Sequence, residues 1–257
     1  GWQTALERLA IVPIVAAIFY IIVVIITRKV VLPSVEAHDA ETGGNADHAF
    51  SKLAKTPLLY LLILIGICYT WSLNAFNDLT PGYMAIDPPM GIGKGAVFAG
   101  SVMIAVQLGN VIGSLLSGVC ITKFFKGNSR IAILVMFLIN CVCCVSIKAS
   151  FVYDNLPVLI VALFFVGFSI ANIMPNVAFF ASTRLPITIV GKVYGTALGV
   201  GLIVGSLGVS LGSMALLMTG TYTASIMIVG AIALIGALGA LGVKRPKVFG
   251  GEKNAAA

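Results

Sequence analysis

The chain has 257 residues, of which 59% are hydrophobic and only 10% carry a charge, and its formal net charge is +7 at pH 7. Because charged residues make up about 25% of an average soluble domain, this composition excludes an ordinary soluble protein. A positive net charge can indicate nucleic-acid binding, but these cations lie in short segments between long apolar runs, where they orient membrane helices. We therefore expect a lipid bilayer around the chain and no nucleic-acid partner.

Seven apolar runs without a charged residue fill most of the chain, at residues 9–27, 58–76, 97–121, 131–147, 156–180, 193–218 and 225–243. A helix needs roughly 20 apolar residues to cross about 30 Å of hydrocarbon, and the runs reach or approach that length. Lipid cannot satisfy unpaired backbone groups, and the runs lack the alternation of polar and apolar residues found in barrel strands. The sequence predicts an all-α membrane protein with seven transmembrane helices.

Lys and Arg are distributed unevenly between the two sides of these spans. All 16 except Arg8, Lys94 and Lys148 lie in the alternate segments that share one side. Because cytoplasmic loops carry the excess of Lys and Arg, we predict that this side is cytoplasmic, with residue 1 outside and the carboxyl terminus inside. The expected location is a plasma membrane, with the bacterial inner membrane favoured.

The spans and polar stretches predict four segments: a first span (residues 1–27), a cytoplasmic linker (28–57), a bundle of six spans (58–243) and a cytoplasmic tail (244–257). The linker is polar and is expected to be solvated, although His38 and His48 leave a pH-sensing role as an alternative. Residue 1 is Gly rather than Met, and the first span begins on the outer side without a signal peptide. We therefore expect the chain to be the back part of a longer protein.

Two features of the six-span bundle bear on its internal organisation. Basic turns follow Ile121 and lie around residues 184–192, as expected for two three-helix units of opposite topology, the inverted repeat common in secondary transporters. Glycines four residues apart, which open a helix face to close backbone approach, occur as the pairs Gly109 and Gly113, Gly195 and Gly199, Gly201 and Gly205, and Gly208 and Gly212.

The chain offers little chemistry for catalysis or for a cofactor. All five cysteines lie within the apolar runs, without paired spacing or a nearby histidine, so neither a disulfide framework nor a metal site is expected. The Gly-rich residues 91–95 lack the Lys-Ser/Thr ending and the preceding strand of a phosphate loop. Since the spans contain no acid–base pair, the chain is not expected to be an enzyme or to hold a cofactor.

A motif follows the third run: Gly118-Val-Cys-Ile-Thr122-Lys123-Phe-Phe-Lys126-Gly127-Asn-Ser-Arg130. It resembles Gly-x-x-x-Asp-Arg-x-Gly-Arg-Arg, a cytoplasmic loop of the major facilitator superfamily, in its second-half copy. The proline- and glycine-rich stretch from Pro175 to Gly220 is similar to the tenth and eleventh helices of that family, and residues 36–55 stand in the place of its central loop. The chain therefore resembles the carboxyl-terminal half of a major facilitator superfamily transporter, preceded by the last helix of the amino-terminal half.

The loop motif implies a gating role for the residues that match it, which are Gly118, Lys123, Gly127 and Arg130. Thr122 stands where the family usually has Asp, so the charge pairing attributed to that Asp is absent from this copy. Ordinary anchoring of the helices on the cytoplasmic side is the alternative role for these cations.

Polar side chains inside the spans are the candidates for solute binding, because they are costly in lipid and usually face a partner or a wet cavity. They form stripes in the spans that correspond, by the resemblance, to the seventh, eighth and tenth helices, which line the family's pathway. The predicted substrate-binding residues are Trp71, Asn74, Gln107, Asn110, Asn172 and Asn176. Interhelical hydrogen bonding is the alternative for each of them, and it is the role expected for Asn140, on what resembles a peripheral helix.

The resemblance implies secondary active or facilitative transport of a small organic solute by alternating access. This chain would supply one half of the pathway, and the missing amino-terminal half of the same polypeptide would supply the other. No span carries an acid or base near its middle, which favours a neutral or weakly charged solute and places any proton coupling in the other half; uniport and exchange stay open. The alternative class is a seven-helix receptor or rhodopsin-like protein, although residues 225–243 lack the Schiff-base lysine of a retinal protein.

Overall fold

The structure, a computed structural model, describes residues 14, 15, 17–26 and 46–244, divided into two units between Asn45 and Ala46. In the first unit an apolar helix spans Ala17–Ile26, and its large side chains are exposed. The rest of the first predicted span, most of the predicted linker and nearly all of the predicted tail lie outside the described residues. The count of seven transmembrane helices therefore stays a prediction.

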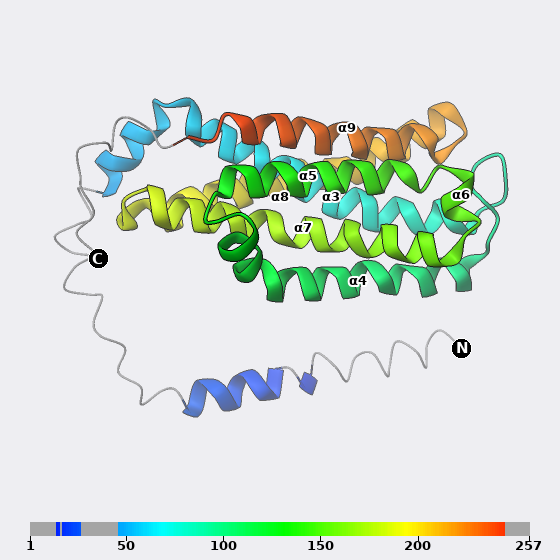
Figure 1. The fold of residues 1–257 in the computed structure, drawn as a ribbon, viewed down its shortest axis with the longest axis horizontal. Helices are drawn as coiled ribbons and strands as arrows, with labels where there is room; N and C mark the ends of the chain where they lie inside the picture. The colour runs from blue at the N-terminus through cyan, green and yellow to red at the C-terminus, as the bar shows by residue number, and fades with distance from the viewer. Residues whose placement is uncertain (1–13, 16, 27–45, 245–257) are drawn as a thin grey trace. The chain divides into compact units, whose positions relative to one another are not determined.

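The second unit contains six helices that are long and apolar enough to cross a membrane: α3 (Pro57–Ala85), α4 (Ala96–Val119) with its π-helical extension η1 (Cys120–Phe124), α5 (Ser129–Ser146), α7 (Leu156–Arg184), α8 (Ile187–Thr219) and α9 (Tyr222–Leu241). A short helix, α6 (Ser150–Tyr153), joins α5 to α7. Successive long helices run in opposite directions, so their connections alternate between the two ends of the bundle (Figure 1). The six spans predicted within residues 58–243 are thus present as helices.

Local sequence signals explain several helix ends. α3 begins at Pro57, whose fixed φ and missing N–H suit the first turn of a helix. The start of α5 is capped by Asn128, whose side-chain oxygen accepts a hydrogen bond of 3.3 Å from the amide of Ile131. α8 ends at Gly220, which has the left-handed conformation (φ 67°) common just beyond a helix.

α3 is longer than its apolar run. The run ends at Phe76, but the helix continues through Pro81 to Ala85. Asp78 therefore lies inside the helix, about two turns before its end.

The long helices of the second unit pack in a regular pattern. α3 packs most extensively on α8, α4 packs on α7, and α5 packs on both α7 and α9, while α9 also packs on α3. If α3 is exchanged with α7, α4 with α8 and α5 with α9, the same pairs of neighbouring helices result. Two three-helix units of opposite direction would pack in this way, although the repeat itself stays a prediction.

Glycines bring the backbones of α3 and α8 together. A Cβ at Gly66 would overlap the carbonyl group of Ala197, and a Cβ at Gly201 would lie 2.7 Å from the carbonyl carbon of Gly66. At the same crossing the Thr70 hydroxyl donates a hydrogen bond of 2.6 Å to the Gly201 carbonyl. The contact therefore depends on the missing side chains at both glycines.

The α4–α7 crossing is built in the same way. A Cβ at Gly109 would overlap the Phe164 carbonyl, and a Cβ at Gly167 would overlap the Val106 carbonyl. By contrast, no described atom lies within 4 Å of a Cβ built at Gly195 or Gly199. The predicted pair Gly195 and Gly199 therefore lies on a face of α8 that no described residue covers.

Part of the predicted linker folds against the bundle. Residues 46–54 form a helix in which Leu53 is fully buried and joins the same hydrophobic cluster as Leu58 of α3. Asp47 of this helix forms an ion pair with Lys192 of α8. Solvation of the whole linker is therefore not observed, because an apolar side chain near its end is covered.

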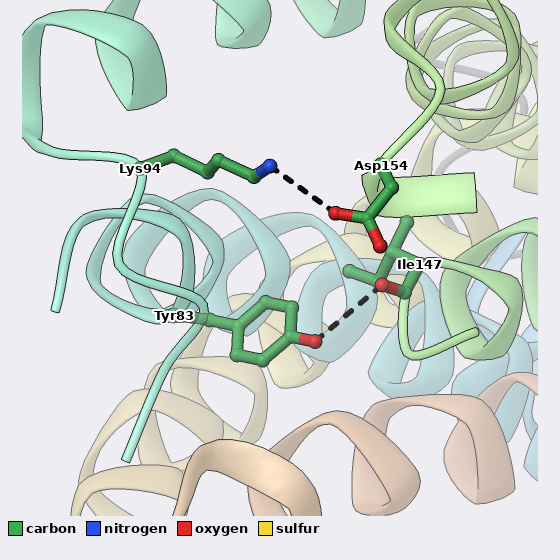
Figure 2. A network of polar contacts seen from close by, with 4 residues as sticks. All are labelled: Tyr83, Lys94, Ile147 and Asp154. Carbon is green, nitrogen blue, oxygen red and sulfur yellow. Dashed lines mark hydrogen bonds and ion pairs between the residues drawn. The ribbon is translucent and has the colours of Figure 1, made fainter. Parts of the chain in front are cut away.

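At the opposite end of the bundle, polar contacts join the connections between helices. Lys94, in the α3–α4 connection, forms an ion pair of 3.2 Å with Asp154 beside α6, and the Tyr83 hydroxyl lies 3.5 Å from the Ile147 carbonyl, which accepts its hydrogen bond (Figure 2). Lys148 Nζ donates to Thr223 Oγ1 at 2.8 Å and lies 4.7 Å from the centre of the Tyr83 ring. Partial burial lowers the pKa of the Lys148 ammonium group.

Replacing Gly66 with Ala should destabilise the bundle by roughly 1–3 kcal/mol, because the methyl group would force α3 away from α8. The matched control is Gly195→Ala, where the methyl group enters open space and better helix propensity should leave stability unchanged or slightly higher. Thermal unfolding of both purified variants in detergent measures the difference. Equal melting temperatures for the two variants would contradict the described crossing.

The orientation of the second unit can be tested by cysteine labelling. Asn155 is exposed near α6 and Lys55 is exposed at the end where most cations lie. Asn155→Cys should react with an impermeant maleimide in intact cells, whereas Lys55→Cys should react only after permeabilisation, since the basic end is predicted to be cytoplasmic. The parent chain with its native cysteines is the control, and the reverse labelling pattern would invert the topology.

Candidate functional site

A hollow of about 440 Å³ lies between α3 and α8 in the second unit. Its lining consists of Leu73, Asn74, Asn77 and Asp78 from α3, and Ser206 and Val209 from α8. The four α3 positions share one helix face, since residues three and four apart are neighbours on a helix. Two amides, one carboxylate and one hydroxyl thus gather inside two otherwise apolar helices.

The polar side chains of the hollow are accessible. Asp78 and Ser206 are exposed, and Asn74 and Asn77 are partly exposed. Among the described residues, Asp78 has no ion-pair partner. Polar groups within a span are costly against lipid, so this face fits a water-filled pathway better than a lipid contact.

A chain of side-chain amides continues from the hollow onto α4. Gln107 Nε2 donates a hydrogen bond of 3.1 Å to Asn77 Oδ1, and Asn110 Nδ2 donates one of 3.3 Å to Gln107 Oε1. Asn77 Nδ2 in turn donates to the Leu73 carbonyl at 2.7 Å. Three of the predicted substrate-binding residues, Asn74, Gln107 and Asn110, are therefore brought to one region.

The other predicted substrate-binding residues lie elsewhere. Trp71 is 9% exposed and packs toward Gly208 of α8, while Asn172 and Asn176 are 0% and 1% exposed. Asn172 Nδ2 donates to the Phe168 carbonyl at 2.8 Å, within its own helix. None of these three residues lines the hollow, and their substrate contacts stay predictions.

The burial of Asn172 follows from the glycine contact between α4 and α7. A Cβ at Gly113 would lie only 3.1 Å from Asn172 Nδ2, so α4 closes over this face of α7. A stripe of polar residues at helical spacing identifies a helix face, but it does not reveal which neighbour covers that face.

The hollow-lining residues absent from the predicted substrate-binding set are Leu73, Asn77, Asp78, Ser206 and Val209. Asn77 and Asp78 directly follow the apolar run, which ends at Phe76, and α3 continues past them to Ala85. Ser206 follows Gly205, which packs against Thr70 of α3, and this adjacency was a usable signal. A small residue at a helix contact often has polar neighbours at the edge of the same contact.

The loop motif lies at the basic end of the bundle. Gly118 has open space around its Cβ position, Lys123 is exposed on η1, and Gly127 has the left-handed conformation (φ 75°) that glycine tolerates. The Thr122 hydroxyl donates to the Gly118 carbonyl at 2.8 Å, so it replaces the family's Asp with a neutral group bonded to its own helix. Within the described residues, neither Lys123 nor Arg130 forms an ion pair, and the gating role stays a prediction.

An all-helical bundle with six apolar spans and a polar hollow between two of them defines a multi-pass membrane protein with a candidate solute site. The family model of the Major Facilitator Superfamily matches residues 1–213, and the chain belongs to this family. Searches of curated proteins and of solved structures returned no match. The family resemblance drawn from the sequence is thereby confirmed.

Members of this superfamily are transporters rather than enzymes, so the protein is a membrane transporter. The family match gives no support to the alternative of a seven-helix receptor. It identifies neither the solute nor the residues that bind it.

Asn140 of α5, expected to serve as interhelical glue, is fully buried, yet neither polar atom of its side chain has a hydrogen-bond partner among the described residues. Burying an amide without a partner costs about 1–3 kcal/mol. Asn140→Leu, which keeps a similar volume, should therefore leave the melting temperature unchanged or raise it. Thr70→Val is the control, expected to lower stability by removing the 2.6 Å bond from the buried hydroxyl to the Gly201 carbonyl. A large loss for Asn140→Leu alone would show that Asn140 has a polar partner.

Proposed function

We propose that the chain supplies one half of the pathway of a Major Facilitator Superfamily transporter, which moves a small organic solute across the plasma membrane by alternating access. Transport is facilitative or secondary active. The observation that carries the proposal is the polar hollow between α3 and α8, extended by the amide chain on α4. These side chains lie within spans and are open on one side, as a solute pathway requires.

The packing pattern supports the inverted repeat in this proposal. Glycines from both helices form the α3–α8 crossing and the α4–α7 crossing. Exchanging the two three-helix units turns one of these helix pairs into the other. Substrate sites of such transporters lie near the midplane, at the interface between repeats. The hollow joins one helix of each proposed unit, as this arrangement requires.

The uncovered face of α8 supports the proposed partner, which is the amino-terminal half of the same polypeptide. Gly191, Gly195 and Gly199 have no described atom within 4 Å of a Cβ position, and they stand four residues apart. Lipid tails gain nothing from such a face, whereas another helix can approach it closely. The proposed domain division keeps residues 1–27 with that half, 28–57 as the cytoplasmic linker, 58–243 as the bundle and 244–257 as a cytoplasmic tail.

The hollow also narrows the solute class. Asn74, Asn77 and Ser206 offer hydrogen bonds to a neutral solute, and Asp78 adds one negative charge without a cation nearby among the lining residues. We therefore favour a small solute with several hydroxyl or amino groups that is neutral or carries one positive charge. The lining residues of the hollow indicate neither the direction of transport nor a coupling ion.

The test of this function is a comparison of affinity and stability in matched variants. Monosaccharides, nucleosides, monocarboxylates and primary amines are screened by thermal shift on the purified protein, and the most stabilising solute becomes the radiolabelled probe. Asn74→Ala and Asn77→Ala should each weaken its binding about two- to tenfold, because one hydrogen bond to the solute or to its binding network is lost. Their melting temperatures without solute should barely change, since water replaces the lost group.

Asn140→Ala is the control, because its side chain is fully buried on α5, does not line the hollow and leaves a cavity when it is truncated. It should lower the melting temperature and leave the affinity of the surviving protein intact. If Asn74→Ala and Asn77→Ala behave like this control in both measurements, the hollow is not the solute site. Asp78→Asn adds the charge test, since it should weaken binding of an amine probe far more than binding of a neutral one.

A further inference from the structure

A second pocket lies at the basic end of the bundle, remote in sequence from the residues that line the hollow. Its volume is about 240 Å³, and it lies where α5 begins, α7 ends and α9 has ended. The lining residues are Gly127, Asn128, Ser129, Arg130, Phe180, Arg184, Val243 and Lys244. None of them belongs to the proposed solute pathway.

Three cations from three separate segments converge on this pocket. Arg130 comes from the first turn of α5, Arg184 from the last residue of α7, and Lys244 from the segment after α9. No carboxylate lines the pocket, and the ion pairs of the described residues involve other cations. The pocket therefore gathers like charges, which is unfavourable unless an anion lies among them.

The backbone adds further donors at the same place. Asn128 caps α5 by accepting a hydrogen bond from the amide of Ile131. The amides of Ser129 and Arg130 have no acceptor among the described residues. Such amides form the positive end of the helix dipole. Helix N-termini bind phosphate groups through these amides. Guanidinium groups donate paired hydrogen bonds that match the oxygens of a phosphate.

From this convergence we propose that the pocket binds a phosphate group through Arg130, Arg184, Lys244 and the first amides of α5. The phosphate belongs to the headgroup of an anionic phospholipid. The buried side chains of Phe180 and Val243 close the pocket on its inner side, and the pocket lies at the ends of membrane-spanning helices, where lipid headgroups are found. Basic pockets between the ends of transmembrane helices bind such headgroups. This assignment does not depend on the identity of the transported solute.

The test uses native mass spectrometry and thermal shift on the purified chain, titrated with phosphatidylglycerol, with phosphatidylcholine or with inorganic phosphate. Phosphatidylglycerol should bind with a defined stoichiometry and raise the melting temperature, whereas phosphatidylcholine should do neither. Arg184→Gln and Lys244→Gln should each weaken phosphatidylglycerol binding about tenfold, because a charge-assisted contact is lost. Melting temperatures without lipid serve as the check that each variant is folded.

Lys123→Gln is the matched control, since Lys123 is an exposed cation in the same loop region that does not line the pocket. It should retain the affinity of the parent chain. Arg184→Lys should fall between Arg184→Gln and the parent, because it keeps the charge and loses the paired donors. Binding of inorganic phosphate alone, sensitive to Arg184→Gln, would support the phosphate site and assign it to a soluble ligand. Equal effects of Lys123→Gln and Arg184→Gln, or no binding of either anion, would overturn the proposal.

Discussion

The bundle depends on two places where helix backbones touch. At each of them, one glycine on either helix removes the side chain that would hold the backbones apart, with Gly66 and Gly201 at one crossing and Gly109 and Gly167 at the other. Hydrophobic burial gives little driving force between helices in lipid, so close van der Waals packing carries more of the association. The polar hollow exists because α3 and α8 are held at this distance along their contact while Asn74, Asn77 and Ser206 stand at its edge.

The two ends of the bundle differ in how charge is used. At the end opposite the basic loops, Lys94 and Asp154 neutralise each other, and Lys148 is held between Thr223 and the Tyr83 ring, so that the loops are joined to one another. At the basic end, cations gather around a pocket without a carboxylate, which leaves charge available for a ligand or for the membrane surface. The loops at one end are thus joined to one another, whereas the cations around the pocket can contact lipid headgroups.

The sequence was informative about the helices and much less so about the site. Lipid imposes helical structure on long apolar runs, so residues 58–243 could be assigned to six spans without knowing any contact. The apolar run ends at Phe76, and the structure adds that α3 continues through Asp78 and Pro81 to Ala85, because a proline near the end of a helix is tolerated. Which polar face is open depends on neighbours, and Gly113 covers Asn172 in a way that spacing along one helix cannot reveal.

Pro81 affects the backbone of α3 beside the hollow, because it removes one hydrogen bond of the helix. A helix normally bonds each carbonyl to the amide four residues later, and proline has no amide hydrogen to donate. The carbonyl of Asn77 therefore lacks its usual partner at the very position where the Asn77 side chain lines the hollow. The main chain itself thus has a hydrogen-bond acceptor that the α3 ladder leaves open, on a residue that also lines the hollow. Alanine scanning of every lining residue would leave this acceptor in place, and only restoring an amide at position 81 would remove it.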